Sequence, residues 1–181
     1  MPVERTAKRL LRQTTLTGLA APEPSSSASS KSKTKSKSKS KSKSDRVYTD
    51  AVLTIKPEFM ELIAKREKNH EYRKYELRDT VERIWLYEIA PVSAITHVIT
   101  TSRPKKPGEV NDPSGVGNDD FDNGLKQSKY GYPVLGLHKL NPPLGPSDLK
   151  ARFKIAPPQG YYYATKKLVE EVKLEDMEKL F

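Results

Sequence analysis

Residues 51–73 have the sequence AVLTIKPEFMELIAKREKNHEYR, the most informative stretch of the chain for its architecture. Residues 51–55 are rich in β-branched side chains and predict a strand. Proline suits the first turn of a helix, and residues 57–66 then place apolar side chains at helical spacing. Residues 70–77 alternate as a second strand would. The stretch therefore predicts a strand, a short helix and another strand in succession.

The rest of the chain after residue 73 predicts further strands separated by Pro- and Gly-rich breaks. Strands are predicted at residues 83–89, 93–101 and 132–140, with residues 161–172 closing the sheet. Helical segments are predicted at residues 146–153 and 175–181, and a long loop at residues 103–120. This pattern indicates an α+β fold with mainly antiparallel strands, a small β-barrel with two or three short helices.

Charge divides the chain into residues 1–45 and residues 46–181. The whole chain has a formal net charge of +10, of which the first 45 residues carry +8 and the remainder +2. Residues 31–44 alternate Lys and Ser, with seven lysines and no apolar residue. Such a segment cannot bury enough surface to offset its chain entropy. We therefore predict a disordered basic tail at 1–45 and one folded domain at 46–181.

Composition excludes several classes of site. The chain contains no cysteine, so disulfides, zinc–cysteine centres and cysteine nucleophiles are absent. Its three histidines, His70, His97 and His138, lack ligand spacing, and we predict no metal site and no cofactor. No apolar run is long enough to cross a membrane, and no signal core is present. We expect an intracellular protein, nuclear or cytoplasmic.

Two blocks of the predicted domain resemble a known family. Ile55-Lys56-Pro57, a helix and then Glu67-Lys68-Asn69-His70-Glu71-Tyr72-Arg73 form the first block, and residues 83–91, RIWLYEIAP, form the second. In this order they resemble the ASCH domain, a PUA-like fold, over most of residues 51–165. The resemblance implies binding of RNA or of modified nucleosides.

Some small members of that family are amidohydrolases acting on N4-acetylcytidine. The resemblance places their threonine nucleophile at the position of Glu71, with Lys68 assisting. A carboxylate does not replace an activated hydroxyl in acyl transfer. We therefore expect a binding module without catalysis, and keep hydrolysis of an acylated nucleoside, with Lys68 and Glu71 as the catalytic groups, as an alternative.

The chemistry of the same residues favours a pocket for one base. Lys56 stands at a strand-to-helix corner, and Glu71 and Arg73 share a strand face with groups that bind amines, phosphate or a base edge. Trp85 and Tyr87 offer rings for stacking. The predicted ligand-binding set is Lys56, Lys68, Glu71, Arg73, Trp85 and Tyr87. The alternatives are a simple ion pair for Glu71 and Arg73 and core packing for the two rings.

The predicted partner is a nucleic acid or a nucleoside, held by the domain and assisted by the lysines of the tail. A second hypothesis is an adaptor in a nuclear complex that binds a protein through residues 3–19. Within that segment, residues 13–19 resemble the start of a sliding-clamp docking peptide, although the usual aromatic pair is missing. Membrane association is not expected.

Overall fold

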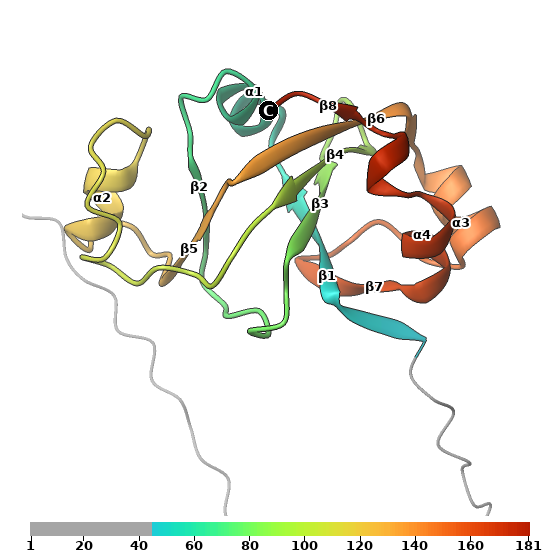
Figure 1. The fold of residues 1–181 in the computed structure, drawn as a ribbon, viewed down its shortest axis with the longest axis horizontal. Coiled ribbons are helices and arrows are strands. Elements are labelled where there is room, and N and C mark those ends of the chain that lie inside the picture. Colours follow the sequence, from blue (N-terminus) through green and yellow to red (C-terminus); the bar gives the residue numbers. More distant parts are fainter. Residues whose placement is uncertain (1–44) are drawn as a thin grey trace, which may run out of the picture. The chain divides into compact units, whose positions relative to one another are not determined.

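The structure, a computed structural model, describes residues 45–181 (Figure 1). The predicted basic tail, apart from Asp45, and the segment 3–19 lie outside the described residues. The described part has the strands β1 (Arg46–Ile55), β2 (His70–Arg73), β3 (Arg83–Glu88), β4 (Ala94–Thr100), β5 (Tyr130–Pro133), β6 (Gly136–Leu144), β7 (Tyr161–Thr165) and β8 (Glu178–Lys179). Its helices are α1 (Pro57–Ala64), α2 (Asn118–Asp122), α3 (Pro146–Phe153), α4 (Lys166–Glu171) and the 3-10 turn η1 (Leu174–Asp176).

Six of these strands form one sheet in the order β7-β1-β3-β4-β6-β8. The β1–β3 pair is parallel, and the other four pairs are antiparallel. The strands β7 and β8 are the two edges, so the sheet is open and not closed into a barrel. The expected α+β class with mainly antiparallel strands is confirmed, with four α-helices where two or three short ones were predicted.

The connection between the parallel strands β1 and β3 carries α1 and β2 (Figure 1). Parallel neighbours need such a crossover because a tight turn cannot join them. Within the crossover, β2 leaves the main sheet and pairs with β5, with Glu71 opposite Tyr132 and Arg73 opposite Tyr130. This two-stranded sheet holds β2 beside α1, and that arrangement positions the candidate site.

Both faces of the central sheet are covered by apolar side chains. One core combines Leu53 and Leu86 of the sheet with Met60 and Ile63 of α1. The core on the other face combines Trp85 with residues of α3 and α4, among them Leu149, Phe153 and Leu168. Strands buried on both faces lose the polar alternation of half-exposed strands. This explains the nearly continuous apolar composition of β1, β3 and β4.

Three local predictions differ from the structure. The helix predicted at residues 175–181 is the short 3-10 turn η1 followed by strand β8. The strand predicted from residue 132 to 140 is two strands, and β6 continues through Pro142 and Pro143 to Leu144, where its register with β4 is irregular. Prolines are tolerated at such irregular positions. The segment predicted as one strand at 161–172 ends as a strand at Thr165 and continues as α4 from Lys166. Thr165 caps that helix, because its Oγ1 accepts a hydrogen bond from the backbone N–H of Leu168.

Within residues 45–181, no helix has the length and apolarity to cross a membrane.

Candidate functional site

The candidate site lies where the end of β1, helix α1 and strand β2 meet. The chain leaves β1 at Lys56, and Pro57 starts α1, as expected for a residue with a fixed φ and no N–H to satisfy. Helix α1 buries Met60 and Ile63 and leaves Phe59 41% exposed. Strand β2 then returns beside the helix with Glu71, Tyr72 and Arg73.

Two cavities of about 310 and 350 Å³ share Phe59, Glu71 and Tyr72 in their walls. We call the two together the groove. The first part is completed by Lys68, Val116, Lys126, Gln127 and Ser128. The second part is completed by Thr54, Ile55, Lys56, Arg73 and Ile89. Each volume falls within the ~300–1,000 Å³ usual for small-molecule sites.

Glu71 is held between two cations in this groove. Its Oε1 lies 2.9 Å from Arg73 Nη2, and its Oε2 lies 2.9 Å from Lys68 Nζ. The Lys68 contact lacks hydrogen-bond geometry, so among the described residues Glu71 Oε2 and Arg73 Nε are both buried without a hydrogen-bond partner. Arg73 Nε is therefore a buried donor without a partner, which is costly, whereas the charge on Glu71 Oε2 is compensated by the Lys68 ammonium. The pair is therefore suited to a polar ligand more than to stabilising the fold.

Lys68 is one of the least exposed charged groups in the described chain, with 7% of its side chain accessible. Burial lowers the pKa of its ammonium, an effect that the carboxylate of Glu71 opposes. Lys68 Nζ also donates to the carbonyl of His70 and lies 4.8 Å from the centre of the Tyr72 ring. These contacts fix the head group at the wall of the groove.

Positive charge dominates the lining of the groove. The groove is lined by four basic side chains and one carboxylate, that of Glu71. The basic residues are Lys56, Lys68, Arg73 and Lys126. Lys56 is an exposed cation, and its Nζ lies 3.6 Å from Oε1 of the exposed Glu58. A concave surface lined by one sign of charge attracts ligands of the other sign. The groove therefore favours an anionic group such as a phosphate.

Aromatic rings supply the flat surfaces of the groove. Tyr72 packs against Phe121 of α2 with ring centres 4.5 Å apart, and its hydroxyl donates to Asn118 Oδ1 at 2.5 Å. Burial raises the pKa of Tyr72, helped by nearby carboxylates including that of Asp122, so the hydroxyl stays protonated. Phe59 is the other ring, and it is the more exposed of the two.

The long loop between β4 and β5 is tied to β2 through a network of amide groups. Asn118 is buried and donates to Asn69 Oδ1 at 2.9 Å and to the carbonyl of Asp112 at 2.8 Å. Asn69 in turn donates to Asp112 Oδ2 at 2.6 Å. Gly115 fits against this network because a Cβ there would lie 2.2 Å from Asn69 Oδ1. The segment predicted as a mobile loop is therefore an ordered wall of the site.

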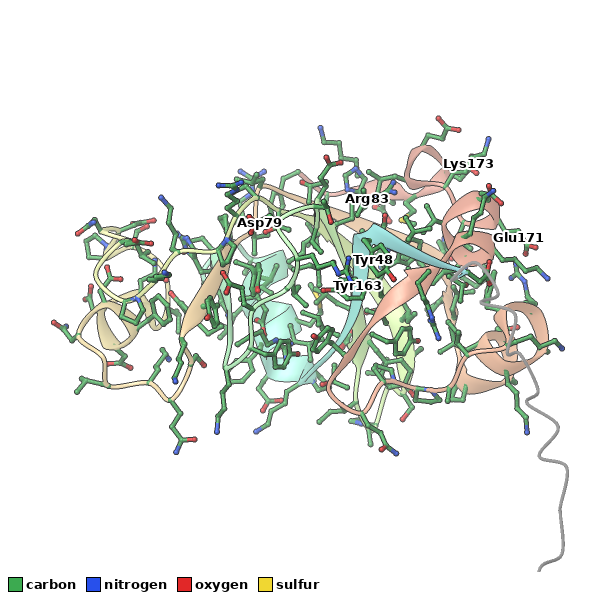
Figure 2. The ribbon with its side chains drawn as sticks, turned by 90° about the horizontal axis from the view of Figure 1, so that it is seen from below. Tyr48, Asp79, Arg83, Tyr163, Glu171 and Lys173 are labelled. Carbon is green, nitrogen blue, oxygen red and sulfur yellow. The ribbon has the colours of Figure 1, made fainter. Side chains whose placement is uncertain are left out.

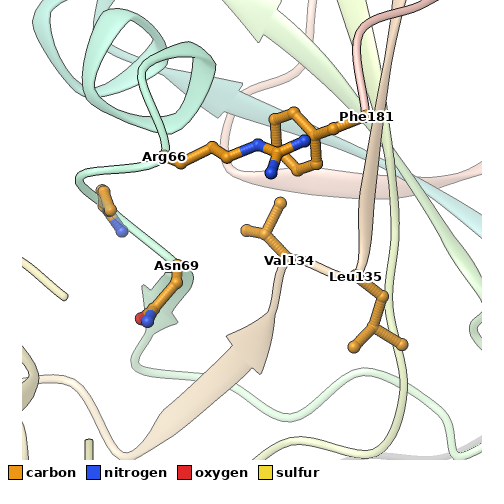
Figure 3. A pocket seen from close by; sticks show the side chains of 6 residues that line it. Arg66, Asn69, Val134, Leu135 and Phe181 are labelled. Atoms are coloured by element: carbon orange, nitrogen blue, oxygen red, sulfur yellow. The ribbon is translucent and has the colours of Figure 1, made fainter. Parts of the chain in front are cut away.

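A third cavity of about 330 Å³ lies on the other side of Lys68. Arg66, Asn69, Val134, Leu135 and Phe181 line it together with Lys68 (Figure 3). The guanidinium of Arg66 covers the Phe181 ring at 4.3 Å from its centre. Lys68 thus lines both this cavity and the groove.

Comparison with solved structures identifies the fold. The crystal structure of ASCH from Zymomonas mobilis matches 73% of this chain and 98% of its own, with a TM-score of 0.53 at 17% identity. A serine-to-alanine variant of that protein matches 70% of this chain and 95% of its own, with a TM-score of 0.51 at 18% identity. The described residues have the ASCH fold. No family model and no curated protein matches the chain.

The ASCH fold brings together four of the six residues predicted to bind a ligand. Lys56, Glu71 and Arg73 line one part of the groove, and Lys68 and Glu71 line the other. No group of metal-ligating side chains is found among residues 45–181.

Trp85 and Tyr87 lie elsewhere in this ASCH fold and are not part of the groove. They are 1% and 6% exposed and belong to the core beneath α3 and α4. Trp85 Nε1 donates to the buried Asp50 Oδ1 at 2.9 Å. Residues alternate across a strand, so these rings face away from α1, the helix that borders the groove. Their place in the proposed site is corrected to core packing.

Three further residues that line the groove, Phe59, Tyr72 and Lys126, were missed from the sequence. Phe59 belongs to the apolar stripe of α1, but a helical turn places it at the edge of the buried face. Tyr72 alternates with Glu71 along β2, which predicts opposite faces, yet both side chains line the groove. Lys126 comes from a distant loop, and only the pairing of β2 with β5 brings that loop close.

Proposed function

We propose that the domain binds a nucleobase or nucleotide in the groove. The observation that carries this proposal is that Lys56, Glu71 and Arg73 border one cavity with the rings of Phe59 and Tyr72. This combination offers a carboxylate, a guanidinium, an ammonium and two aromatic surfaces to a single ligand. The ASCH fold, which is associated with RNA and modified nucleosides, supports the same class of ligand.

Each group has a defined task in such a complex. Glu71 accepts hydrogen bonds from an exocyclic amine or ring N–H, and Arg73 donates from Nε to a neighbouring acceptor of the same base edge. Phe59 and Tyr72 cover the base, and stacking on such rings contributes about 1–3 kcal/mol per base. Lys56 and Lys126, at the two ends of the groove, are placed for phosphate.

Isothermal titration of the full chain with the four nucleoside monophosphates tests this proposal. Glu71→Gln changes an acceptor-only group into one that also donates, so it alters the preference among bases. Phe59→Ala removes a stacking surface and lowers affinity about 10-fold. Val92→Ala, on a side chain 45% exposed outside the groove, is the matched control. Binding that is unaffected by both groove substitutions would exclude the groove as the ligand site.

Hydrolysis of an acylated nucleoside is a second candidate, favoured by the environment of Lys68. Burial lowers the pKa of its ammonium, which makes the neutral amine more accessible at physiological pH. That amine, or the Glu71 carboxylate, would accept a proton from water attacking the amide. Incubation with N4-acetylcytidine and chromatography of released cytidine distinguishes the candidates. Turnover that Lys68→Ala abolishes favours the hydrolase, and absence of turnover leaves the binding module.

An adaptor role through residues 3–19 stays a prediction, because that segment lies outside the described residues. Affinity capture from a nuclear extract, with the full chain and with a variant in which Gln13, Leu16 and Leu19 are alanine, tests it. A set of partners that the triple substitution leaves unchanged would remove this segment from consideration.

A further inference from the structure

A band of tyrosines continues from the groove along the edge of the sheet. Tyr75 stacks on Tyr161 with ring centres 4.4 Å apart and an interplanar angle of 23°. Tyr161 meets Tyr163 edge-on at 5.9 Å, and Tyr163 meets Tyr48 edge-on at 5.1 Å. Figure 2 shows the last two side by side on β7 and β1. We call these four residues the tyrosine band.

Strand register explains why the band forms on one face. Tyr161 pairs with Leu53 of β1 and Tyr163 pairs with Ala51, so both rings project to the face that α1 covers. Tyr162, between them, projects into the opposite core. The strand β7 has no neighbour on its outer side among the described strands, and Tyr161 remains 37% exposed. Tyr161 is therefore the most exposed ring of the band, while Tyr75 and Tyr163 are partly buried against the core on that face.

Arginine is interleaved with these rings. The guanidinium of Arg78 lies 3.8 Å from the centre of the Tyr48 ring and 5.6 Å from that of Tyr163. The backbone N–H of Arg78 also donates to Tyr163 Oη at 3.0 Å, which fixes the turn beneath the ring. A guanidinium beside these rings adds a positive charge for phosphate to the stacking surfaces that the rings offer to bases.

The band is continuous with the groove at two points. Arg73, which lines the groove, is two residues before Tyr75, which lies in the bend that follows β2. Thr54 also lines the groove, and its backbone N–H donates to the carbonyl of Gly160, the residue before Tyr161. The carbonyl of Thr54 accepts a hydrogen bond from Arg73 Nη2. At the other end, β1 begins at Arg46, and the Lys/Ser-rich sequence joins the domain at Asp45.

From this continuity we propose that the tyrosine band and Arg78 bind a single strand of nucleic acid whose adjoining base occupies the groove. The inference rests on the proposed function for that one base and adds the class of ligand, an oligonucleotide rather than a free nucleoside. Single-stranded nucleic acid fits because its unpaired bases stack on aromatic rings without regard to sequence. The negative backbone matches Arg78 and Arg73.

Fluorescence anisotropy of the full chain with a labelled eight-nucleotide single strand tests the proposal, with titration of a nucleoside monophosphate in parallel. Tyr161→Ala is expected to weaken the octanucleotide about 10-fold, and Arg78→Gln several-fold. Tyr161→Phe keeps the ring and should keep the affinity. Arg152→Gln removes the same charge from α3, where Arg152 is half exposed, and serves as the control for Arg78→Gln. Thermal melts verify that each variant is folded.

The outcomes separate the band from the groove. If Tyr161→Ala and Arg78→Gln weaken the octanucleotide and leave the monophosphate unchanged, the band is supported. If both variants bind the octanucleotide as the parent does, the band is overturned while the groove stands. If no monophosphate binds but the octanucleotide affinity still depends on Tyr161, the groove fails and the band survives. A chain that binds a proline-rich peptide at Tyr161 but no octanucleotide would overturn the proposal in favour of a protein partner.

Discussion

Lys68 Nζ lies 2.9 Å from Glu71 Oε2, and each side chain is only 7% exposed. They are three positions apart in sequence, and the chain changes between them from the turn after α1 to strand β2. Arg73 completes the arrangement from the other side of the carboxylate, at 2.9 Å. Desolvating such a set is expensive, so buried ion pairs are weak evidence for stabilisation. The arrangement is better explained by the ligand that we propose for the groove.

Removing one partner of this pair should destabilise the domain. Lys68→Met leaves the carboxylate of Glu71 buried with Arg73 as its remaining cation, and we expect a loss of about 2–3 kcal/mol in the free energy of unfolding. Urea denaturation followed by tryptophan fluorescence measures it. Lys65→Met breaks the exposed pair with Glu61, whose side chains are 56% and 65% accessible, and should change nothing measurable. Equal effects of the two substitutions would contradict a buried pair.

His97 should make the domain less stable in mild acid. Burial lowers the pKa of its imidazole from 6.5 to about 4, with a smaller contribution from Lys139, although Glu88 Oε1 lies 3.6 Å away. Its Nδ1 lies 2.8 Å from Thr96 Oγ1. Below pH 6.5 His97 is protonated in the unfolded chain, whereas in the folded chain it is protonated only near pH 4. The free energy of unfolding therefore falls as the pH is lowered through that window, by on the order of 2 kcal/mol.

Two measurements check the role of His97. NMR titration of its ring protons should give a midpoint well below 6.5, and urea midpoints between pH 7.5 and pH 4.5 should fall. His97→Gln retains a polar partner for Thr96 but cannot titrate, so its urea midpoint should depend less steeply on pH. A ring that titrates near 6.5 in the folded protein would refute this account.

Gly115 should be intolerant of any side chain. An added Cβ would meet Asn69 Oδ1 at 2.2 Å and Asn118 Nδ2 at 2.5 Å, so Gly115→Ala must displace the amide network that holds the loop against β2. We expect a loss of about 1–3 kcal/mol in stability, since buried amides would lose their partners. Limited proteolysis should also cut within residues 103–117 sooner.

Gly145→Ala is the control for that experiment. Gly145 precedes α3 with a φ of −78°, and a Cβ there would meet nothing within 4 Å. Any L-residue adopts this backbone conformation, and Gly145 is an N-cap without a side-chain hydrogen bond, so stability should change by less than about 1 kcal/mol. A neutral Gly115→Ala would show that the loop is not held in the way described.

Local signals in the sequence were sufficient for much of the fold. The helix at residues 146–153 has the bounds predicted for it. The strand predicted at 83–89 is β3, in which Ile84 and Leu86 enter one core and Trp85 and Tyr87 the other, as strand alternation requires. Each of these features depends on residues close in sequence. The pairing of β2 with β5 joins residues about 60 apart and leaves no comparable local pattern.

The same contrast applies to the candidate site. Charged residues of one short stretch, Lys68, Glu71 and Arg73, were found because a strand period places the last two together. The rings were misassigned because an apolar ring on a strand indicates burial and stacking equally well. Only the structure shows that Trp85 is covered by α3 and α4, whereas Phe59 lies at the margin of α1.

The lysines at residues 31–43 should govern the salt dependence of nucleic-acid binding and leave base preference to the groove. On a single strand, each lysine that neutralises a phosphate contributes about 0.7 to the slope of log affinity against log salt. Replacing all seven lysines with Gln should therefore flatten the slope while the ranking of oligo-A, oligo-C and oligo-U is kept. Replacing them with Arg retains the charge and should retain the slope. Anisotropy titrations between 50 and 300 mM salt measure the slope and the ranking. If the base preference were lost when the lysines are replaced, the groove would not be the site that distinguishes the bases.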